Sequence, residues 1–345
     1  MATEDGRDTP AGRDGNWRLL RWAALGLSVP LLAFALAWLL TLGDYPVAAT
    51  VADDPTLPVI EASGYRFHGE VFGPESAPPV IVIHGGPGWD YRSLLPLKAL
   101  GDDHRVVSYD QRGSGLSPRV PAQSLSVDSS LSDLDAIVEK FRAGGRVILI
   151  GHFWGAMLAT AYLGRFPDKV SHAVLAEPGF LDAGLFRQSG LRLGPRWEAG
   201  YLFLAGRRWF ESLHIRGPDT DAAADYFLGE AAAHANPEYY CGDRLPPAGT
   251  LRWRAGATAM GAITGPLIES GEGFDLTRGL QDFPRPVLLL ASACNRMIGV
   301  EQQRRHLARF ARAELSVIAD SGHMVFAEQP AAALSAVRHY LAQKP

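Results

Sequence analysis

Short apolar runs alternate with stretches of helical periodicity over most of the chain. The apolar runs occupy residues 79–84, 105–109, 147–151, 173–177, 286–291 and 315–319. Helical periodicity marks residues 131–142, 156–165, 302–311 and 331–342. Residues 58–62 and 65–72 precede them and predict an opening hairpin around Ser63-Gly64. Strands that alternate with helices predict an α/β fold, in which a doubly wound, mostly parallel sheet carries helices on both faces.

A longer apolar run lies near the N-terminus. Residues 22–42 contain no charged side chain, and about 20 such residues suffice to cross a hydrocarbon core of about 30 Å. We therefore expect a transmembrane anchor at 22–42, a polar cytoplasmic leader at 1–21 and a tether at 43–57.

The charges around this run predict its orientation. Arg13, Arg18 and Arg21 precede it, and the first basic residue after it is Arg66. The positive-inside rule places the N-terminus in the cytoplasm and the large domain on the exported side, periplasmic or extracellular. A cleavable signal peptide that ends at Val47-Ala48-Ala49 stays open as the alternative, although the run exceeds the usual 7–15 residues of such a signal.

Composition narrows the functional classes. Of the 345 residues, 47% are hydrophobic and 20% are charged, which is enough for a large core. The net charge of −4 argues against nucleic acid as a partner, because nucleic-acid binding needs a basic face. The two cysteines exclude a disulfide-rich scaffold and a cysteine-built zinc site, and no pattern suggests a metal, nucleotide or other cofactor.

The loops that follow the predicted strands carry the candidate chemistry, because in parallel sheets sites form at the carboxyl ends of strands. His84-Gly85-Gly86-Pro87-Gly88 offers backbone N–H groups for an oxyanion hole. The Asp110–Ser117 turn is expected to brace the loops. Gly151-His152-Phe153-Trp154-Gly155 has the layout of a nucleophile elbow, but Phe153 stands where Ser, Cys or Asp is expected. His323, after the last predicted strand, is a candidate general base.

These motifs resemble the α/β-hydrolase superfamily, in particular the branch around prolyl aminopeptidases. The likeness covers about residues 58–341 and rests on the HGGPG loop, the DQRGxGxS turn, the elbow and the segment from Ser321-Gly322-His323 to Glu328-Gln329-Pro330. It implies a core at 58–178 and 283–345 and a helical lid at 179–282. It also implies an oxyanion hole made by the backbone N–H groups of Gly86 and Trp154.

The chain departs from the family pattern at two positions. A phenyl ring at Phe153 has no lone pair to attack a carbonyl. Asn295 stands where the family usually carries the triad Asp, and an amide cannot stabilise imidazolium with a full charge. Glu177, which ends the run 173–177, is the expected acid partner of His323. A role as a cap at the lid entrance stays open.

The two cysteines allow two interpretations. A Cys241–Cys294 disulfide would link the lid to the core, as exported proteins permit. The alternative is a Cys294–His323 catalytic dyad.

The resemblance implies descent from serine hydrolases of the peptidase or esterase type, with acyl-enzyme chemistry impaired by Phe153. Non-covalent acid–base catalysis by His323 and Glu177, or binding without catalysis, stay open, so the sequence leaves open whether this chain is an enzyme. The expected partner is a small-molecule or peptide ligand under the lid. Candidate pocket aromatics are Trp197, Tyr201, Trp209, Tyr239, Tyr240 and Trp253. Candidate carboxylates for a peptide amine are Glu198, Asp219, Asp221, Asp225, Glu230 and Glu238.

Overall fold

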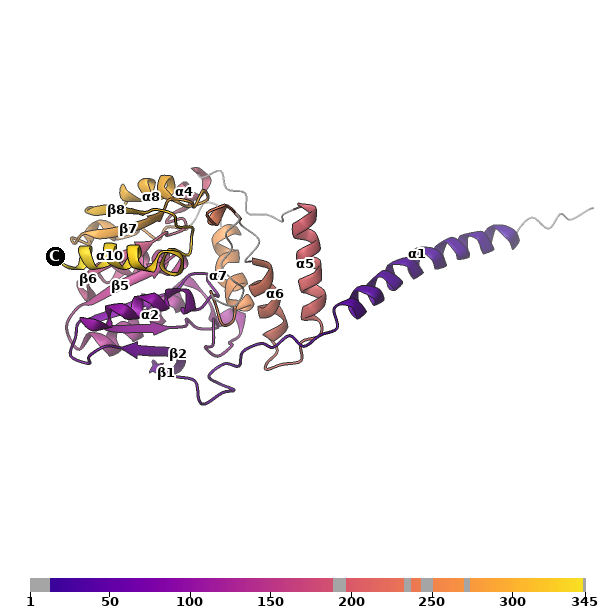
Figure 1. Ribbon diagram of the computed structural model, residues 1–345, viewed down its shortest axis with the longest axis horizontal. Coiled ribbons are helices and arrows are strands. Elements are labelled where there is room, and N and C mark those ends of the chain that lie inside the picture. Colours follow the sequence, from indigo (N-terminus) through magenta and orange to yellow (C-terminus); the bar gives the residue numbers. More distant parts are fainter. Residues whose placement is uncertain (1–12, 189–196, 233–236, 243–250, 270–273, 344–345) are drawn as a thin grey trace, which may run out of the picture.

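The computed structural model describes residues 13–188, 197–232, 237–242, 251–269 and 274–343. An eight-stranded sheet forms its centre (Figure 1), in the order β1-β2-β4-β3-β5-β6-β7-β8. Only the pairings of β2 with β1 and β4 are antiparallel, and the other pairings are parallel. The predicted mostly parallel sheet is therefore confirmed.

The observed elements follow the predicted runs closely. The strands are β1 (Val59–Ala62), β2 (Tyr65–Phe72), β3 (Pro79–Ile83), β4 (Arg105–Tyr109), β5 (Val147–His152), β6 (Val170–Ala176), β7 (Val287–Ser292) and β8 (Ala313–Ile318). The helices of the core are α2 (Val127–Arg142), α3 (Trp154–Arg165), α8 (Val300–Leu307), α9 (Val325–Glu328) and α10 (Pro330–Leu341).

The central strands are apolar at successive positions because both faces of the sheet are covered. Ile81 and Leu149 face a cluster formed with α2 and α3. Val80 and Ile148 face the other cluster, formed with α10 and the 3-10 helix Arg92–Asp102. This two-sided burial fixes the strands and so fixes the loops at their carboxyl ends.

A helical insertion lies between β6 and β7. It contains α4 (Ala183–Gln188), α5 (Ala199–Ser212), α6 (Ala222–Ala232) and α7 (Ala257–Glu269). Figure 1 shows α5, α6 and α7 together at one end of the sheet. The backbone N–H of Gly256 donates to Gly88 O at 2.7 Å, and the N–H of His323 donates to Tyr239 O at 2.6 Å. The insertion therefore covers the loops that follow β3 and β8.

Helix α1 (Arg13–Leu40) projects away from the body (Figure 1). Its segment Arg21–Leu40 is long and apolar enough to cross a membrane, with a mean hydropathy of 2.2 and none of it buried. The first 12 residues of the expected leader lie outside the described residues. Residues 13–21, the rest of the expected leader, form the beginning of α1.

The segment expected as a tether lies against the body. Val51 is buried, and its N–H donates to Leu116 O at 2.9 Å. Arg254 Nη1 donates to Ala48 O at 2.9 Å. Residues 43–57 are therefore held by the core and by the insertion rather than extending freely.

Candidate active site

The turn from β5 into α3 places Phe153 at its apex. Phe153 has φ 49° and ψ −110° and precedes the first residue of α3. A Cβ on Gly155 would lie 2.0 Å from Ile83 O, and one on Gly151 would lie 2.4 Å from Gly155 O. Only glycine fits this close approach of strand and helix. The backbone thus makes a sharp strand-to-helix turn of the kind that a nucleophile elbow requires, with a phenyl ring at its apex.

The Phe153 ring faces the predicted base. Its centroid lies 5.1 Å from that of the His323 imidazole, and the two rings are perpendicular. Tyr239, from the insertion, stacks on the same imidazole at 4.4 Å. His323 therefore lies between two aromatic rings and is almost fully buried.

Glu177 and His323 form a close pair at the ends of β6 and β8. The Glu177 Oε2 to His323 Nδ1 distance is 2.8 Å. Glu177 is fully buried and has φ 46°. Because burial disfavours charge, it raises the pKa of Glu177 to about 8 and lowers the pKa of His323 to about 3. At neutral pH, burial therefore favours the uncharged forms of both groups, and the contact holds a proton between them.

Asn295 holds the carboxyl of Glu177 in place. Asn295 Nδ2 donates to Glu177 Oε2 at 2.7 Å, and the N–H of Ser292 donates to Oε1 at 2.7 Å. Asn295 Oδ1 accepts from the N–H groups of Met297 and Ile298. Asn295 thus fixes the orientation of the carboxyl group that contacts His323.

The amides expected to form an oxyanion hole border the same cavity. Gly86 and Trp154 line it, and neither backbone N–H donates a hydrogen bond within the described part of the chain. Gln111 braces both loops, because its Nε2 donates to His84 O and its Oε1 accepts from Trp154 Nε1. The Asp110–Ser117 turn is therefore structural, as expected.

The cavity has a volume of about 360 Å³ and is mainly apolar. Its described walls include Trp89, Met157, Phe180, Phe186, Leu228, Tyr239, Tyr240, Met260, Leu267, Phe274 and Ile298. Two of the predicted pocket aromatics, Tyr239 and Tyr240, thus contribute. The other four, Trp197, Tyr201, Trp209 and Trp253, are not among the lining residues, and Trp197 and Trp209 are 76% and 45% exposed on the insertion. That part of the sequence prediction was wrong.

Among the described residues that line the cavity, none is a carboxylate, and the basic ones are Arg252 and His323. Asp219 and Asp225, which were candidates for a peptide amine, instead bind the buried Arg254 at 2.7 and 2.8 Å. The described residues contain no group of three or more His, Cys, Asp or Glu able to hold a metal.

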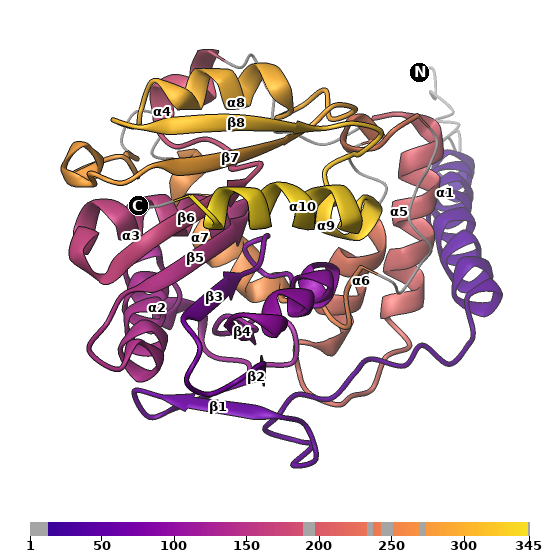
Figure 2. The ribbon, with the colours of Figure 1, turned by 60° about the vertical axis from the view of Figure 1, so that its left-hand side comes forward.

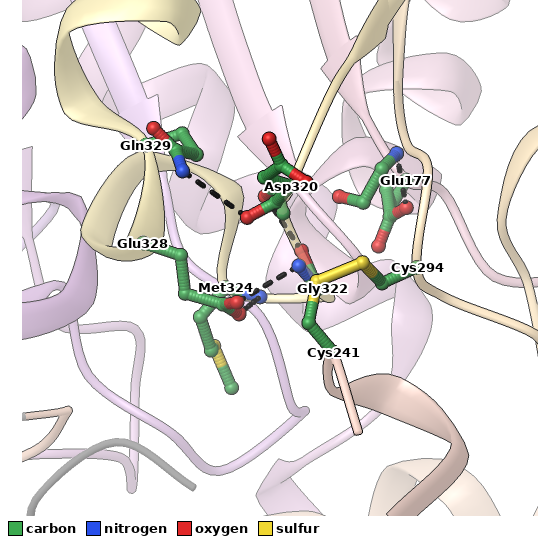
Figure 3. The surroundings of a disulfide bond; sticks show 10 residues. Glu177, Cys241, Cys294, Asp320, Gly322, Met324, Glu328 and Gln329 are labelled. Atoms are coloured by element: carbon green, nitrogen blue, oxygen red, sulfur yellow. Dashed lines mark hydrogen bonds between the residues drawn. A yellow bond between two sulfur atoms is a disulfide. The ribbon is translucent and has the colours of Figure 1, made fainter. Parts of the chain in front are cut away.

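The two cysteines are joined (Figure 3). The Cys241–Cys294 disulfide connects the insertion to the loop after β7, with a Cα–Cα distance of 4.9 Å. The sulfur of Cys294 is therefore not free to form a dyad with His323. Next to it, the N–H of Arg296 donates to Glu238 O at 2.9 Å.

Figure 3 also shows how the histidine loop is held. The carboxylate of Glu328 accepts from the N–H groups of Gly322 and Met324, the two neighbours of His323. His152 Nε2 lies 2.8 Å from His323 O, and the two rings are 4.6 Å apart. The sequence predicted Tyr239 as a pocket aromatic but not its stacking on His323, and it did not predict the contact of His152 with His323. The signal for His152 was its position inside the elbow motif.

Comparisons with known proteins agree with this architecture. A protein-family model described as the alpha/beta hydrolase family matches residues 80–337. The proline iminopeptidase of Heyndrickxia coagulans is 39% identical over 120 residues, which is 33% of this chain and 39% of the relative. Epoxide hydrolase B of Mycobacterium tuberculosis is 29% identical over 161 residues, which is 44% of this chain and 45% of that protein. The chain thus spans less than half the length of these curated relatives.

A solved structure is similar in fold over most of this chain and nearly all of its own chain. The proline iminopeptidase of Mycobacterium smegmatis aligns with a TM-score of 0.61 at 20% identity, over 84% of this chain and 98% of that one. At this identity the likeness concerns the fold alone. Since the family model covers most of the chain and the sheet has the corresponding topology, this protein belongs to the alpha/beta hydrolase family and is related to proline iminopeptidases and epoxide hydrolases.

Proposed function

We propose that this protein is a membrane-anchored relative of serine hydrolases that binds an apolar small molecule beneath the helical insertion and forms no acyl-enzyme. The observation that carries the proposal is Phe153 at the apex of the elbow, with its ring against the His323 imidazole. Nucleophilic catalysis needs an oxygen, sulfur or nitrogen atom at that point, activated by the adjacent base.

No neighbouring group replaces the nucleophile in the described part of the site. The lining hydroxyls belong to Tyr239, Tyr240 and Thr264, all on the insertion, and none of them hydrogen-bonds to His323. Cys294 is held in the disulfide. The base, the acid and the oxyanion donors therefore surround a position that a hydrocarbon ring fills.

The walls of the cavity indicate the class of ligand. Apolar side chains dominate them, and Arg252 is the cation among the described lining residues, because burial favours the uncharged form of His323. The Arg252 guanidinium stacks on Trp89 at 4.8 Å, and its Nη2 donates to Gly229 O. No carboxylate lines the described part of the cavity, so no described lining group there acts as a counter-ion for a free peptide amine. This lining suits a neutral or acidic apolar molecule better than an aminopeptidase substrate. The insertion then serves as the lid of the binding site.

The proposed anchor is α1, with the N-terminus in the cytoplasm and the body on the exported side. Its apolar length and the arginines that precede it support this orientation. The Cys241–Cys294 pair supports export, because disulfides persist in oxidising compartments. Intact mass of the mature protein tests the anchor, since a cleaved signal peptide would remove the mass of α1.

Restoring the nucleophile tests the main proposal. We expect Phe153→Ser to react with a fluorophosphonate probe and to hydrolyse p-nitrophenyl butyrate, because the remaining groups are in place. Wild type, Phe153→Ala and the Phe153→Ser/His323→Ala double variant should do neither. Intact mass spectrometry detects the covalent adduct. An adduct on wild type would contradict the proposal, because it would reveal a nucleophile elsewhere.

The Glu177–His323 pair favours one second candidate, non-covalent acid–base catalysis. An imidazole held by a carboxyl beside two available amides can move a proton and stabilise an oxyanion without a nucleophile. In that case wild type would turn over a substrate without any adduct, and His323→Ala and Glu177→Gln would both abolish turnover. If wild type is inert and a bound apolar acid raises its melting temperature, the binding function is favoured.

A further inference from the structure

Helix α5 carries its apolar side chains on the outside of the molecule. At 100° per residue, Leu202, Phe203, Trp209 and Phe210 fall within one arc of about 120°. Phe203 is 76% exposed, and Leu202 and Trp209 are 44% and 45% exposed. We refer to these four residues as the apolar face of α5.

The opposite side of α5 faces inward and carries polar groups beside Leu204. Glu211 is buried and accepts hydrogen bonds from Arg208 at 2.7 Å and from Tyr226 of α6 at 2.9 Å. A surface helix of a protein surrounded by water has the reverse arrangement. Large apolar side chains gathered on the exposed side of the helix, with a buried carboxylate on the inner side, indicate that the apolar face is covered by something other than water.

The apolar face is continuous with α1. Phe34 of α1 contacts Trp209 and Phe210, with centroid distances of 6.5 and 5.2 Å. Trp38 contacts His214, just after α5, at 4.1 Å. Figures 1 and 2 both show α5 as the helix of the body that lies next to α1.

The depth of this contact can be estimated from the helix rise. Phe34 lies six residues before Leu40, the end of the apolar span, which is about 9 Å at 1.5 Å per residue. Helices that lie in a membrane surface bury their apolar face about 5–10 Å below it. The level at which α1 meets α5 therefore matches an interfacial helix, and Trp209 has the residue type that gathers at that level.

We propose that the apolar face of α5 lies in the surface of the same lipid bilayer that α1 crosses, so that the lid itself is a membrane contact. The inference rests on the proposed anchoring by α1. With α5 in the bilayer surface, the lipid phase is a source of apolar ligand for the cavity. The connection runs through α6, because α5 packs on α6 and α6 contributes Leu228 to the cavity wall.

Spin labels on the full-length chain test this contact. The native cysteines are paired, so single cysteines at Phe203, at Val29 of α1 and at Val71 of β2 can be labelled selectively. Val29 is 63% exposed, and Val71, on β2 of the body, is 40% exposed. Each labelled protein is placed in nanodiscs of phosphatidylcholine and phosphatidylglycerol, and collision rates with oxygen and with a water-soluble nickel chelate are measured.

Compared with the label at 71, we expect the labels at 203 and 29 to collide less often with the nickel chelate and more often with oxygen. The label at 71 should collide freely with the nickel chelate. If position 29 is in lipid while position 203 behaves like 71, the inference about α5 is overturned and the anchor stands. If position 29 is also in water, the proposed anchor and the inference about α5 are both overturned. A label at 203 shielded from both reagents, with dipolar coupling between labels, would show a second copy of the chain on this face and overturn the inference.

Discussion

At the scale of single residues, the site is built on two strained backbones. Phe153 and Glu177 end the adjacent strands β5 and β6 with φ values of 49° and 46°. Such conformations in bulky residues carry a strain of about 1–3 kcal/mol each and persist only where the surroundings impose them. The N–H groups of Phe153 and Glu177 donate to Ala176 O and Leu290 O, both at 2.9 Å. The sheet therefore imposes this backbone geometry on both residues.

The buried pair predicts a specific pH dependence of stability. Glu177 has an ordinary pKa of 4.5, raised to about 8 in the fold, so unfolding releases its proton between these values and stability falls as pH rises. His323 has an ordinary pKa of 6.5, lowered to about 3, so its contribution is lost only as pH falls below 6.5. Above pH 6.5 the slope from this pair therefore belongs to Glu177.

We expect the free energy of unfolding to fall by about 2 kcal/mol between pH 6.5 and 8, at about 1.4 kcal/mol per unit for one proton. Glu177→Gln should remove that fall, as measured by urea unfolding in detergent at several pH values. Glu75→Gln is the control, since its carboxylate is 90% exposed. Equal slopes for wild type and Glu177→Gln would show that Glu177 is ionised in the fold.

At the scale of elements, the strands could be predicted because each central strand is buried on both faces and is therefore a continuous apolar run. The pairing of Glu177 with His323 could be anticipated for a related reason, because parallel strands bring their carboxyl ends to one edge. The insertion was less predictable. Apolar spacing shows which side of α5 is apolar but not what that side faces, so Trp209 was assigned to the pocket. The bracing of Glu177 by Asn295 also needs coordinates, because it depends on a side-chain rotamer.

The Cys241–Cys294 disulfide links the insertion covalently to the loop after β7. It closes a loop with a sequence separation of 53, for which the chain-entropy model gives a stabilisation of about 4 kcal/mol. We expect the Cys241→Ser/Cys294→Ser variant to lose up to that amount in urea unfolding, and reduced wild type to match it. Reductant should not change the free energy of unfolding of the variant. A further loss of stability in the reduced variant would show that reductant acts on something other than this disulfide.

At the scale of the whole molecule, Arg254 joins three parts of the chain. Its guanidinium binds Ala48 O of the segment after α1, and Asp219 and Asp225 of the insertion. Arg119, in the core loop after β4, binds the same Asp225 at 2.9 Å. The body, the insertion and the segment after α1 are thus connected through the cluster of Arg119, Asp225 and Arg254, in which the buried cation Arg254 has a side chain that is 1% exposed.

Replacing Arg254 should weaken the contacts among all three parts. Arg254→Met leaves Asp225 buried beside Arg119 alone, and removing one partner of a buried ion pair destabilises by about 3–5 kcal/mol. We expect a loss of about 3 kcal/mol in urea unfolding, at the low end of that range because Arg119 remains. Protease cleavage between Leu42 and Leu57 should accelerate in parallel, since Ala48 loses its donor. Arg66→Met is the matched control, because its pair with Glu61 is 49% and 72% exposed and such pairs contribute less than about 1 kcal/mol. Destabilisation without faster cleavage would mean that the segment after α1 is held by Val51 and not by Arg254.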